Sequence, residues 1–346
     1  MNTKPNILIT LENGKTRETH FPQFIQTRLA EIGNVRWNET GKPFTAAVLR
    51  GEIADTDICL THWGCPAFSD DVVNNAKKLK LIAHAAGSVA DLCSAGVYDK
   101  NIKVTSANDV MAFYVAEGAL AYILCSLRRI QKADNLMKSN VMWPREDMVR
   151  AETLISKKVS LIGLGAVGRN LLRLLEPFNV RAAVYDPYIN EAQFKSEKLP
   201  CDAELKSLND ALAWGDVISV HASLTPETIN LLGKNELALI RDKCTVINTA
   251  RGAIIDESAL INELERGRLY AVLDVYNPEP PAADSPLRKL ENVILVPHMA
   301  GVTARENMTS AILDEIERFL QGKSLLYEIR RERFEKMTRH SLVNHS

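Results

Sequence analysis

The sequence predicts an α/β protein made of two doubly wound, parallel-sheet domains. Three observations support this fold class. Short apolar runs alternate with helix-like stretches through the first third of the chain, as in a parallel sheet wrapped by helices. A strand, a glycine-rich turn, a helix and a second strand then follow one another within residues 159–187. The length of 346 residues, 46% of them apolar, is enough for about two domains with a core in each.

The first domain is predicted from five short apolar runs. They cover residues 6–11, 46–50, 57–64, 79–87 and 102–107. A helix-like stretch, Phe21 to Ile32, lies between the first two runs. Because parallel strands are buried on both faces, they read as continuous apolar runs, and one α/β domain is therefore expected here.

A helix that begins near Val115 is predicted to lead out of this domain. Its apolar residues keep helical register at positions 120, 123, 124, 127 and 130. The most apolar stretch, residues 118–127, is too short to span a bilayer and is followed at once by two arginines. We therefore expect a buried helix rather than a membrane span.

The second domain is predicted from six further strands. They are expected at residues 159–165, 181–187, 216–223, 245–250, 270–276 and 293–300. Six is the number of strands in two mononucleotide-binding halves. Helices are expected between the strands, for example over residues 257–266, and a last helix is expected over about residues 304–321.

The glycine turn after the first of these strands indicates a dinucleotide site. Gly163 allows a tight turn off the strand, Gly165 lets backbone amides approach a pyrophosphate, and Gly168 lets the helix pack closely on the sheet. The start of that helix then offers unpaired N–H groups to the phosphates.

The residue that ends the next strand favours NAD over NADP. Asp186 follows Gly168 by eighteen residues, where a carboxylate can accept hydrogen bonds from both ribose hydroxyls of an adenosine. A 2′-phosphate would be repelled there, because Pro187 and Tyr188 follow and no Arg or Lys is at hand to neutralise it.

Three polar residues directly after strands are the candidate catalytic group. Arg251, Glu279 and His298 follow the last three predicted strands, whose carboxyl ends form the edge at which ligands of open parallel sheets bind. His298 can move a proton near neutral pH, and Glu279 can fix its tautomer. Arg251 offers a permanently charged fork of donors to a carboxylate and a carbonyl. The group suits hydride exchange between a nicotinamide and a 2-hydroxy acid.

Composition narrows the choice of partners. Lys and Arg number 42 and Asp and Glu number 43, so the net charge is −1, without a long basic run for nucleic acid or an anionic membrane. A small molecule is the expected partner. The six cysteines show no metal-site or disulfide spacing, so no metal is expected. The N-terminus lacks a secretory signal, and a cytoplasmic location is expected.

The sequence resembles the D-isomer-specific 2-hydroxyacid dehydrogenases, a family that includes phosphoglycerate, D-lactate and glyoxylate or hydroxypyruvate enzymes. The resemblance runs from about Leu79 to Gly322. The segments that carry it are VAEGALAYILCSLRRI, LIGLGAVGRNLLRLL, HASLTPETINLLGKNEL, VINTARGAIIDESALINEL, LDVYNPEPP and NVILVPHMAG. It implies that Arg251, Glu279 and His298 are the catalytic arginine, glutamate and histidine of an NAD-dependent enzyme.

The resemblance also implies a site for NAD and a domain layout. The residues expected around NAD, beyond the three glycines and Asp186, are Ala166, Val167, His221, Ala222, Ser223, Thr228, Thr249, Ala250, Asp274 and Gly301, with Asp274 on the nicotinamide carboxamide. A flavodoxin-like substrate domain is expected from residues 1–113 and 304–346, around a Rossmann domain of residues 114–303, with a cleft between the two. A homodimer formed through the NAD-binding domain is expected, and no regulatory domain after the catalytic part.

The chain departs from the family pattern in places. The loop expected to bind the substrate carboxylate reads AHAAGSVADL, and Ser88 and Val89 are the candidates to bind it through their backbone. Trp63 is expected to help shape the substrate pocket. Ser223 and Gly118 stand where proline and histidine are common, and neither is expected to touch the chemistry. The alternative function is an NAD(H)-sensing, corepressor-like binding protein.

Overall fold

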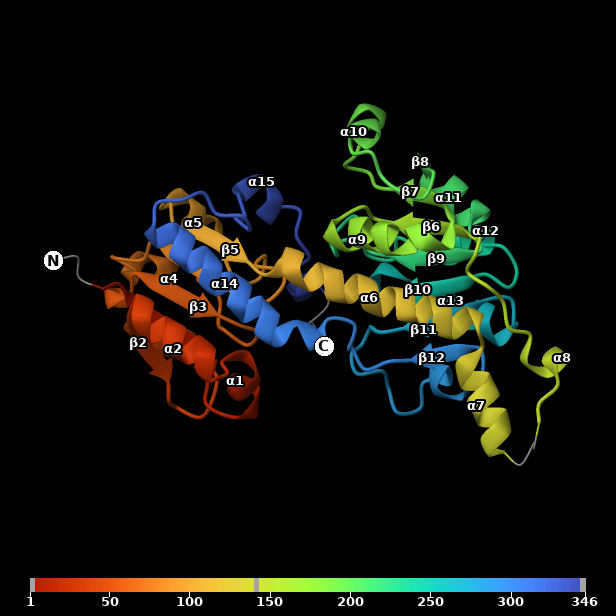
Figure 1. Cartoon of the computed structure of the whole chain (residues 1–346), viewed down its shortest axis with the longest axis horizontal. Helices are drawn as coiled ribbons and strands as arrows, with labels where there is room; N and C mark the ends of the chain where they lie inside the picture. The colour runs from red at the N-terminus through yellow and green to blue at the C-terminus, as the bar shows by residue number, and fades with distance from the viewer. Residues whose placement is uncertain (1–3, 140–142, 343–346) are drawn as a thin grey trace. The chain divides into compact units, whose positions relative to one another are not determined.

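The computed structural model describes residues 4–139 and 143–342, which divide into two compact units. The first unit consists of residues up to 111 together with residues 304–341, and the second consists of residues 112–303 together with Leu342. Residues 343–346, which the sequence assigned to the returning segment of the first domain, lie outside the described part. Figure 1 shows the helices and strands of both units.

The first unit contains a five-stranded, wholly parallel sheet in the order β2-β1-β3-β4-β5. Its strands are β1 (Asn6–Glu12), β2 (Asn34–Asn38), β3 (Ile58–Thr61), β4 (Leu81–His84) and β5 (Lys103–Ser106). This is the order of doubly wound, flavodoxin-like folds, and it confirms the predicted fold class. The strand order reverses between β1 and β3, and the carboxyl ends of strands at such a switch point are where ligands of open parallel sheets bind.

One expected strand of this sheet forms a helix instead. The apolar run at 46–50 lies in α3 (Ala46–Glu52), because alanine favours helix and the Thr45 side chain caps the helix by accepting a hydrogen bond from the Val48 N–H at 3.3 Å. The missing strand is β2, an edge strand whose exposed and half-buried residues alternate. Because β2 has no continuous apolar run, its sequence does not predict a strand.

Helices cover both faces of this sheet. They are α1 (Lys15–His20), α2 (Gln23–Ile32), α3, α4 (Asp70–Asn75), α5 (Ala95–Asp99), α14 (Arg305–Leu320) and α15 (Arg331–Phe334). The late helix α14 lies beside the early helices α1 and α2 (Figure 1), and Ile329, Phe334 and Met337 from the returning segment join the apolar core. The buried carboxylate of Glu315 fastens this segment by accepting bonds from the N–H groups of Leu326 and Tyr327 at 2.9 and 2.8 Å.

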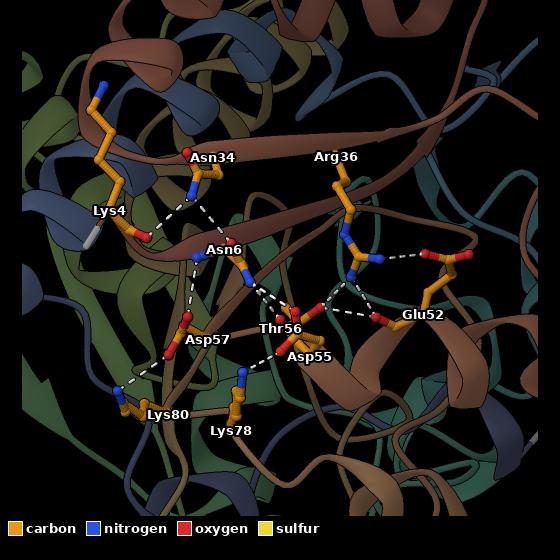
Figure 2. Close-up of polar contacts among 10 residues, drawn as sticks. All are labelled: Lys4, Asn6, Asn34, Arg36, Glu52, Asp55, Thr56, Asp57, Lys78 and Lys80. Carbon is orange, nitrogen blue, oxygen red and sulfur yellow. Dashed lines mark hydrogen bonds and ion pairs between the residues drawn. The ribbon is translucent and has the colours of Figure 1, made fainter.

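A polar network ties together the amino ends of these strands (Figure 2). The Asp57 carboxylate accepts a hydrogen bond from the backbone N–H of Asn6 at 3.0 Å and pairs with Lys80 at 3.2 Å. The Asn34 amide donates to the Asn6 side-chain oxygen at 3.3 Å, so the starts of four strands, β1, β2, β3 and β4, are joined. Most of these side chains are partly exposed, and the network is a surface fastening at the edge opposite the one where ligands of such sheets bind.

The second unit contains a seven-stranded parallel sheet in the order β12-β11-β10-β9-β6-β7-β8. Its strands are β6 (Lys158–Ile162), β7 (Arg181–Tyr185), β8 (Ala203–Leu205), β9 (Val217–Val220), β10 (Thr245–Asn248), β11 (Tyr270–Leu273) and β12 (Val293–Leu295). The six predicted strands are all present, in the Rossmann order with β6 at the switch point. The seventh, β8, has three residues and was not predicted.

Helices surround this sheet as expected of a doubly wound fold. They are α6 (Asn108–Leu127), of which residues 112–127 belong to this unit, α7 (Ile130–Lys138), α8 (Glu146–Val149), α9 (Ala166–Leu175), α10 (Glu191–Ser196), α11 (Leu208–Trp214), α12 (Lys234–Leu239) and α13 (Glu257–Glu265). The predicted helices at 257–266 and 304–321 are found within one residue at each end, as α13 and α14.

The helix α6 is longer than expected. It begins at Asn108, seven residues before Val115, where the Ser106 hydroxyl accepts a hydrogen bond from the Asn108 N–H at 3.2 Å. Within the described residues it is the one helix long and apolar enough to cross a membrane by length and composition alone, a test that core helices of soluble proteins also pass. Ala116, Ala119 and Ile123 are fully buried in the core of the second unit, which accounts for its apolar composition.

Candidate active site

The three glycines of the turn between β6 and α9 differ in their structural roles. A Cβ on Gly163, where φ is +103°, would lie 2.6 Å from the backbone nitrogen of Ala222, and a Cβ on Gly168 would lie 2.6 Å from the Gly163 carbonyl oxygen. Gly165 differs, because it is exposed and a Cβ there would meet no atom within 4 Å. The first and third glycines therefore serve packing, and the second leaves space for a ligand.

The start of α9 faces this open space. Gly165 is the N-cap and supplies no side-chain acceptor, so the first N–H groups of this ten-residue helix keep their capacity to bind an anion. Ala166 and Val167 are the first two helical residues and are half-buried. Arg169, one turn further, is paired with Glu197 at 2.5 Å.

Asp186 lies at the end of β7, next to the glycine turn. Its carboxylate accepts hydrogen bonds from the Leu164 N–H at 2.8 Å and the Tyr188 N–H at 2.9 Å. Each oxygen keeps a second lone pair, so the fixed carboxylate can still accept two hydroxyl groups. Pro187 and Tyr188 are exposed and bring no cation to this position.

The loop after β9 contacts the glycine turn through Ala222. His221 is half-buried, with Nε2 at 2.8 Å from the Ser219 hydroxyl, and burial lowers the pKa of its imidazole to about 3, so the ring is neutral. The Thr228 hydroxyl donates to the Ser223 carbonyl oxygen at 2.7 Å and accepts from the Thr225 N–H at 2.8 Å. Thr228 therefore holds the loop in shape from inside, and its contact with NAD stays a prediction.

Arg251 follows β10 in a loop that a buried amide organises. The Asn248 side chain donates to the Arg251 carbonyl oxygen at 3.0 Å and accepts from the Ala250 N–H at 3.0 Å. A Cβ on Gly252 would lie 2.0 Å from the Tyr276 carbonyl carbon, so only glycine lets this loop approach the backbone after β11. Thr249 is 7% exposed. The sequence interpretation missed Asn248, although an asparagine that ends a strand three residues before an arginine is a recognisable signal.

Glu279 and His298 are joined by a short hydrogen bond. Glu279 Oε1 lies 2.6 Å from His298 Nδ1, and the two side chains are 39% and 45% exposed. Partial burial raises the pKa of Glu279, but the hydrogen bond and charge of His298, the Tyr276 N–H and the charge of Arg251 together outweigh it and lower the pKa below its usual value. The pair therefore carries an ionised carboxylate at neutral pH and leaves the histidine Nε2 available for a proton.

A cavity of about 530 Å³ opens beside this pair. Besides Glu279 and His298 it is lined by Tyr276, Pro280, Pro281, Arg288, Leu295, Val296 and Pro297. The Arg288 guanidinium donates to the carbonyl oxygens of Ala282 and Pro281, both at 2.9 Å, so this cation is already engaged.

Asp274 follows β11 and is buried beside the loop that carries His298. It is 1% exposed, and its carboxylate accepts from the N–H groups of Met299 and Ala300 at 2.8 and 3.1 Å and from the Tyr122 hydroxyl at 3.1 Å. One lone pair of Oδ2 remains for a further donor, so the contact with a carboxamide stays a prediction. Gly301, half-buried, follows this segment directly.

Gly118 in α6 packs against the loop that carries His298. A Cβ on Gly118 would lie 3.1 Å from both Cα and Cβ of Ala300, two residues beyond His298. Helix α6 therefore packs directly on the loop that carries His298, and the expectation that this position does not touch the chemistry stays a prediction.

The candidate substrate residues of the first unit lie at or after the carboxyl ends of β3 and β4. The Ser88 hydroxyl donates to the Thr338 carbonyl oxygen at 2.7 Å, so it fastens the returning segment. Val89 has its side chain in the core, which leaves only its backbone for a ligand. Trp63 is 48% exposed and packs edge-on against His20, with ring centroids 6.0 Å apart.

A comparison with protein families decides what this arrangement belongs to. A family model described as "D-isomer specific 2-hydroxyacid dehydrogenase, NAD binding domain" matches residues 120–300, more than half of the chain. The chain belongs to the D-isomer specific 2-hydroxyacid dehydrogenase family. This confirms the resemblance on which the expected layout of the site depends.

Known members of the 2-hydroxyacid dehydrogenase family resemble the chain over most of its length. A glyoxylate reductase from Aeropyrum pernix is 30% identical over 73% of this chain and 77% of the relative. A D-3-phosphoglycerate dehydrogenase from Methanocaldococcus jannaschii is 31% identical over 85% of this chain. The match covers only 55% of that enzyme, and the chain spans about half the length of the phosphoglycerate dehydrogenases it matches.

A solved structure supports the fold. A protein from Thermus thermophilus superposes with a TM-score of 0.74 at 25% identity, over 94% of this chain and all of that one. Within this family fold, the open space at Gly165, the uncapped start of α9 and the carboxylate of Asp186 fit a dinucleotide.

Proposed function

We propose that the protein is an NAD-dependent reductase of 2-oxo acids, or dehydrogenase of D-2-hydroxy acids. The observation that carries the proposal is the 2.6 Å contact between Glu279 and His298 in the dinucleotide-binding unit, with the charge of Arg251 acting on Glu279. Family membership supports the same reaction class.

Each of the three residues has a distinct role in this proposal. The Glu279 carboxylate accepts a hydrogen bond from Nδ1–H of His298 and so leaves Nε2 to give a proton to the substrate oxygen during reduction, or to take it during oxidation. Arg251 binds the carboxylate and polarises the carbonyl through its fixed fork of donors. The nicotinamide ring, when bound, supplies or accepts the hydride.

NAD is the proposed cofactor. The backbone N–H groups at Gly165, Ala166 and Val167 would bind the pyrophosphate, and Asp186 would accept the ribose hydroxyls. Two solved structures of the same fold carry titles that name NADPH, so the preference rests on Asp186, whose negative charge opposes a 2′-phosphate.

The first experiment measures NADH oxidation by the purified protein against glyoxylate, hydroxypyruvate, pyruvate, phosphohydroxypyruvate and bulky branched or aromatic 2-oxo acids. We expect clear turnover with at least one of them. His298→Ala should lower kcat about 1000-fold while leaving the Kd of NADH nearly unchanged, because general acid–base catalysis contributes about 10²–10⁴-fold. Arg251→Ala should abolish measurable turnover.

The exposed His340 in the returning segment provides the matched control. His340→Ala should keep wild-type turnover. Wild-type activity in His298→Ala would refute the proposed role of this residue. NADH binding without turnover on any 2-oxo acid would contradict the catalytic function and favour a cofactor-sensing protein.

We also propose that the protein works as a homodimer through its NAD-binding unit and in the cytoplasm. Family expectation supports the dimer, and the residue composition supports the small-molecule partner. Light scattering of the purified protein tests the dimer, and a monomer at micromolar concentration would contradict it.

A further inference from the structure

The segment that follows β12 places the candidate acid–base histidine in an unusual backbone conformation. His298 has φ of +51°, in the left-handed region that non-glycine residues adopt at a cost of about 1 kcal/mol. The His298 N–H donates to the carbonyl oxygens of Asp274 at 2.9 Å and Val296 at 3.0 Å. Such a conformation persists only where the surroundings enforce it.

The Asp274 side chain enforces it from one side. Its two oxygens receive the N–H groups of Met299 and Ala300, the two residues directly after His298. Since Asp274 is 1% exposed, water does not compete for these bonds, and charged hydrogen bonds of this kind are the strong ones. Asp274 thus binds all three N–H groups of residues 298–300, one through its carbonyl oxygen and two through its carboxylate.

Helix α6 supports the arrangement from another side. The Tyr122 hydroxyl donates to Asp274 Oδ1 at 3.1 Å. Desolvation, followed by the charge of Asp274, raises the pKa of Tyr122, so the phenol stays protonated and remains a donor. One turn earlier, Gly118 packs on Ala300 so closely that a Cβ would lie 3.1 Å from its Cα.

We propose that Tyr122 and Asp274 are positioning residues that lock the 298–300 turn and thereby hold His298 in register with Glu279 and the substrate oxygen. Neither acts on the substrate in this inference, which rests on the proposed function of His298. Tyr122 sets the orientation of the Asp274 carboxylate, and Asp274 sets the turn.

The test is Tyr122→Phe, which removes the hydroxyl and keeps the ring. We expect kcat to fall about 10-fold, with the KM values for NADH and for the 2-oxo acid unchanged within about 2-fold, because a misplaced catalytic group lowers the rate of the chemical step. Asp274→Ala should lower kcat about 100-fold, because it releases the turn itself. The melting temperature of Tyr122→Phe should stay close to that of the wild type.

The matched control is Tyr98→Phe in the first unit. The buried hydroxyl of Tyr98 makes no hydrogen bond to any described residue, so its loss removes the same atom from a buried ring without breaking a clamp. This variant should keep the wild-type kcat. A fall equal to that of Tyr122→Phe would overturn the inference, and so would a Tyr122→Phe variant with unchanged kcat or with a loss confined to the KM for NADH.

A second measurement is independent of turnover. Amide hydrogen exchange at Met299 and Ala300, followed by NMR in the protein without substrate, should be at least about 10-fold faster in Tyr122→Phe than in the wild type, because the carboxylate that protects both N–H groups loses its orientation. Unchanged exchange at both amides would overturn the clamp. If no 2-oxo acid is turned over, the proposed function fails, but this measurement still decides whether the clamp exists.

Discussion

At the scale of single residues, two carboxylates of the second unit, Asp186 and Glu279, are held in place by hydrogen bonds from their neighbours. Asp186 is fixed by two backbone N–H groups and Glu279 by one backbone N–H and one imidazole, so neither must be reoriented to receive a ligand. Preorganised groups of this kind contribute to binding and catalysis without a reorganisation cost when the ligand arrives.

The negative charge of Asp186 should determine the preference for NADH over NADPH. Asp186→Asn removes the negative charge but keeps an oxygen to accept the Leu164 N–H. We expect the Kd of NADH to rise about 10-fold, roughly 1.4 kcal/mol, and the preference for NADH over NADPH to shrink by at least the same factor. Fluorescence titration with both cofactors measures this. Glu191→Gln, an exposed acid of the same unit, is the control, and an unchanged preference in Asp186→Asn would contradict the assigned role.

Residue types and their places after strands were enough to identify Arg251, Glu279 and His298 as a group. The sequence could not reveal that Glu279 and His298 meet at Nδ1, because that contact depends on how the chain turns after β11 and β12. Tyr122 had no signal at all. Only the approach of α6 to the 298–300 turn gives its hydroxyl a partner.

At the scale of elements, the turn between β6 and α9 separates two functions of glycine. Gly168 lies against the Gly163 carbonyl and brings the helix onto the strand, while Gly165 lies at the exposed start of the helix with open space above it. The same motif therefore contains one glycine needed for folding and one needed for a ligand.

This separation predicts opposite phenotypes for two alanine substitutions. Gly168→Ala should destabilise the protein by about 2 kcal/mol, because a Cβ 2.6 Å from a backbone oxygen forces the helix outward. Gly165→Ala should cost less than about 1 kcal/mol in unfolding free energy but weaken NADH binding about 10-fold or more, because the new methyl occupies the approach of the pyrophosphate. Thermal unfolding and NADH titration of both variants measure the contrast, and equal losses of stability would contradict it.

Strands were predicted correctly where the sequence shows a continuous apolar run, and incorrectly where packing determines the secondary structure. The six strands of the second unit are continuous apolar runs, and they were found. The segment at 46–50 is apolar as well, but its alanines and the Thr45 cap favour α3, while the polar β2 is a strand only because β1 offers it a free edge. Apolarity alone does not distinguish these cases.

At the scale of the whole molecule, three buried histidines of the first unit should make its stability depend on pH. His20, His62 and His84 are at most 4% exposed, and the rings of His20 and His62 lie 4.6 Å apart. Burial lowers the pKa of His84 to about 3, and burial with the charge of Arg305 lowers that of His20 to about 4. Burial lowers the pKa of His62 most, and the charges of His20 and His84 lower it further. All three are neutral in the folded protein.

Stability should therefore fall as the pH decreases below about 6.5, the ordinary pKa of histidine in the unfolded chain, because the unfolded state then binds protons that the folded state excludes. The loss should continue until the pH reaches the lowered folded values. When the pH is lowered from about 7.5 to 5.5, each of these histidines should decrease the free energy of unfolding by about 1.4 kcal/mol, which makes about 4 kcal/mol for the three.

Urea unfolding of the protein at these two pH values, followed by a probe in the first unit, measures the loss. His84→Gln should reduce the pH-dependent loss of the first unit by about a third, because it removes one of the three titrating histidines of that unit, and the exposed His340→Gln should leave the loss unchanged. A His84→Gln protein with the full wild-type dependence would show that these imidazoles are not its source.

The sequence by itself determined the fold class, the dinucleotide turn, the acid that favours NAD and the polar residues that follow the strands. These features are local, because each depends on residue type, on spacing along the chain and on the rule that parallel strands end at one edge. Only the tertiary structure decided the partners: the clamp of Asp274 and Tyr122 on the histidine turn, the approach of Gly118 to Ala300, and the three buried imidazoles of the first unit. These contacts join segments far apart in the chain, and their energies come from burial and close approach, which no spacing along the sequence specifies.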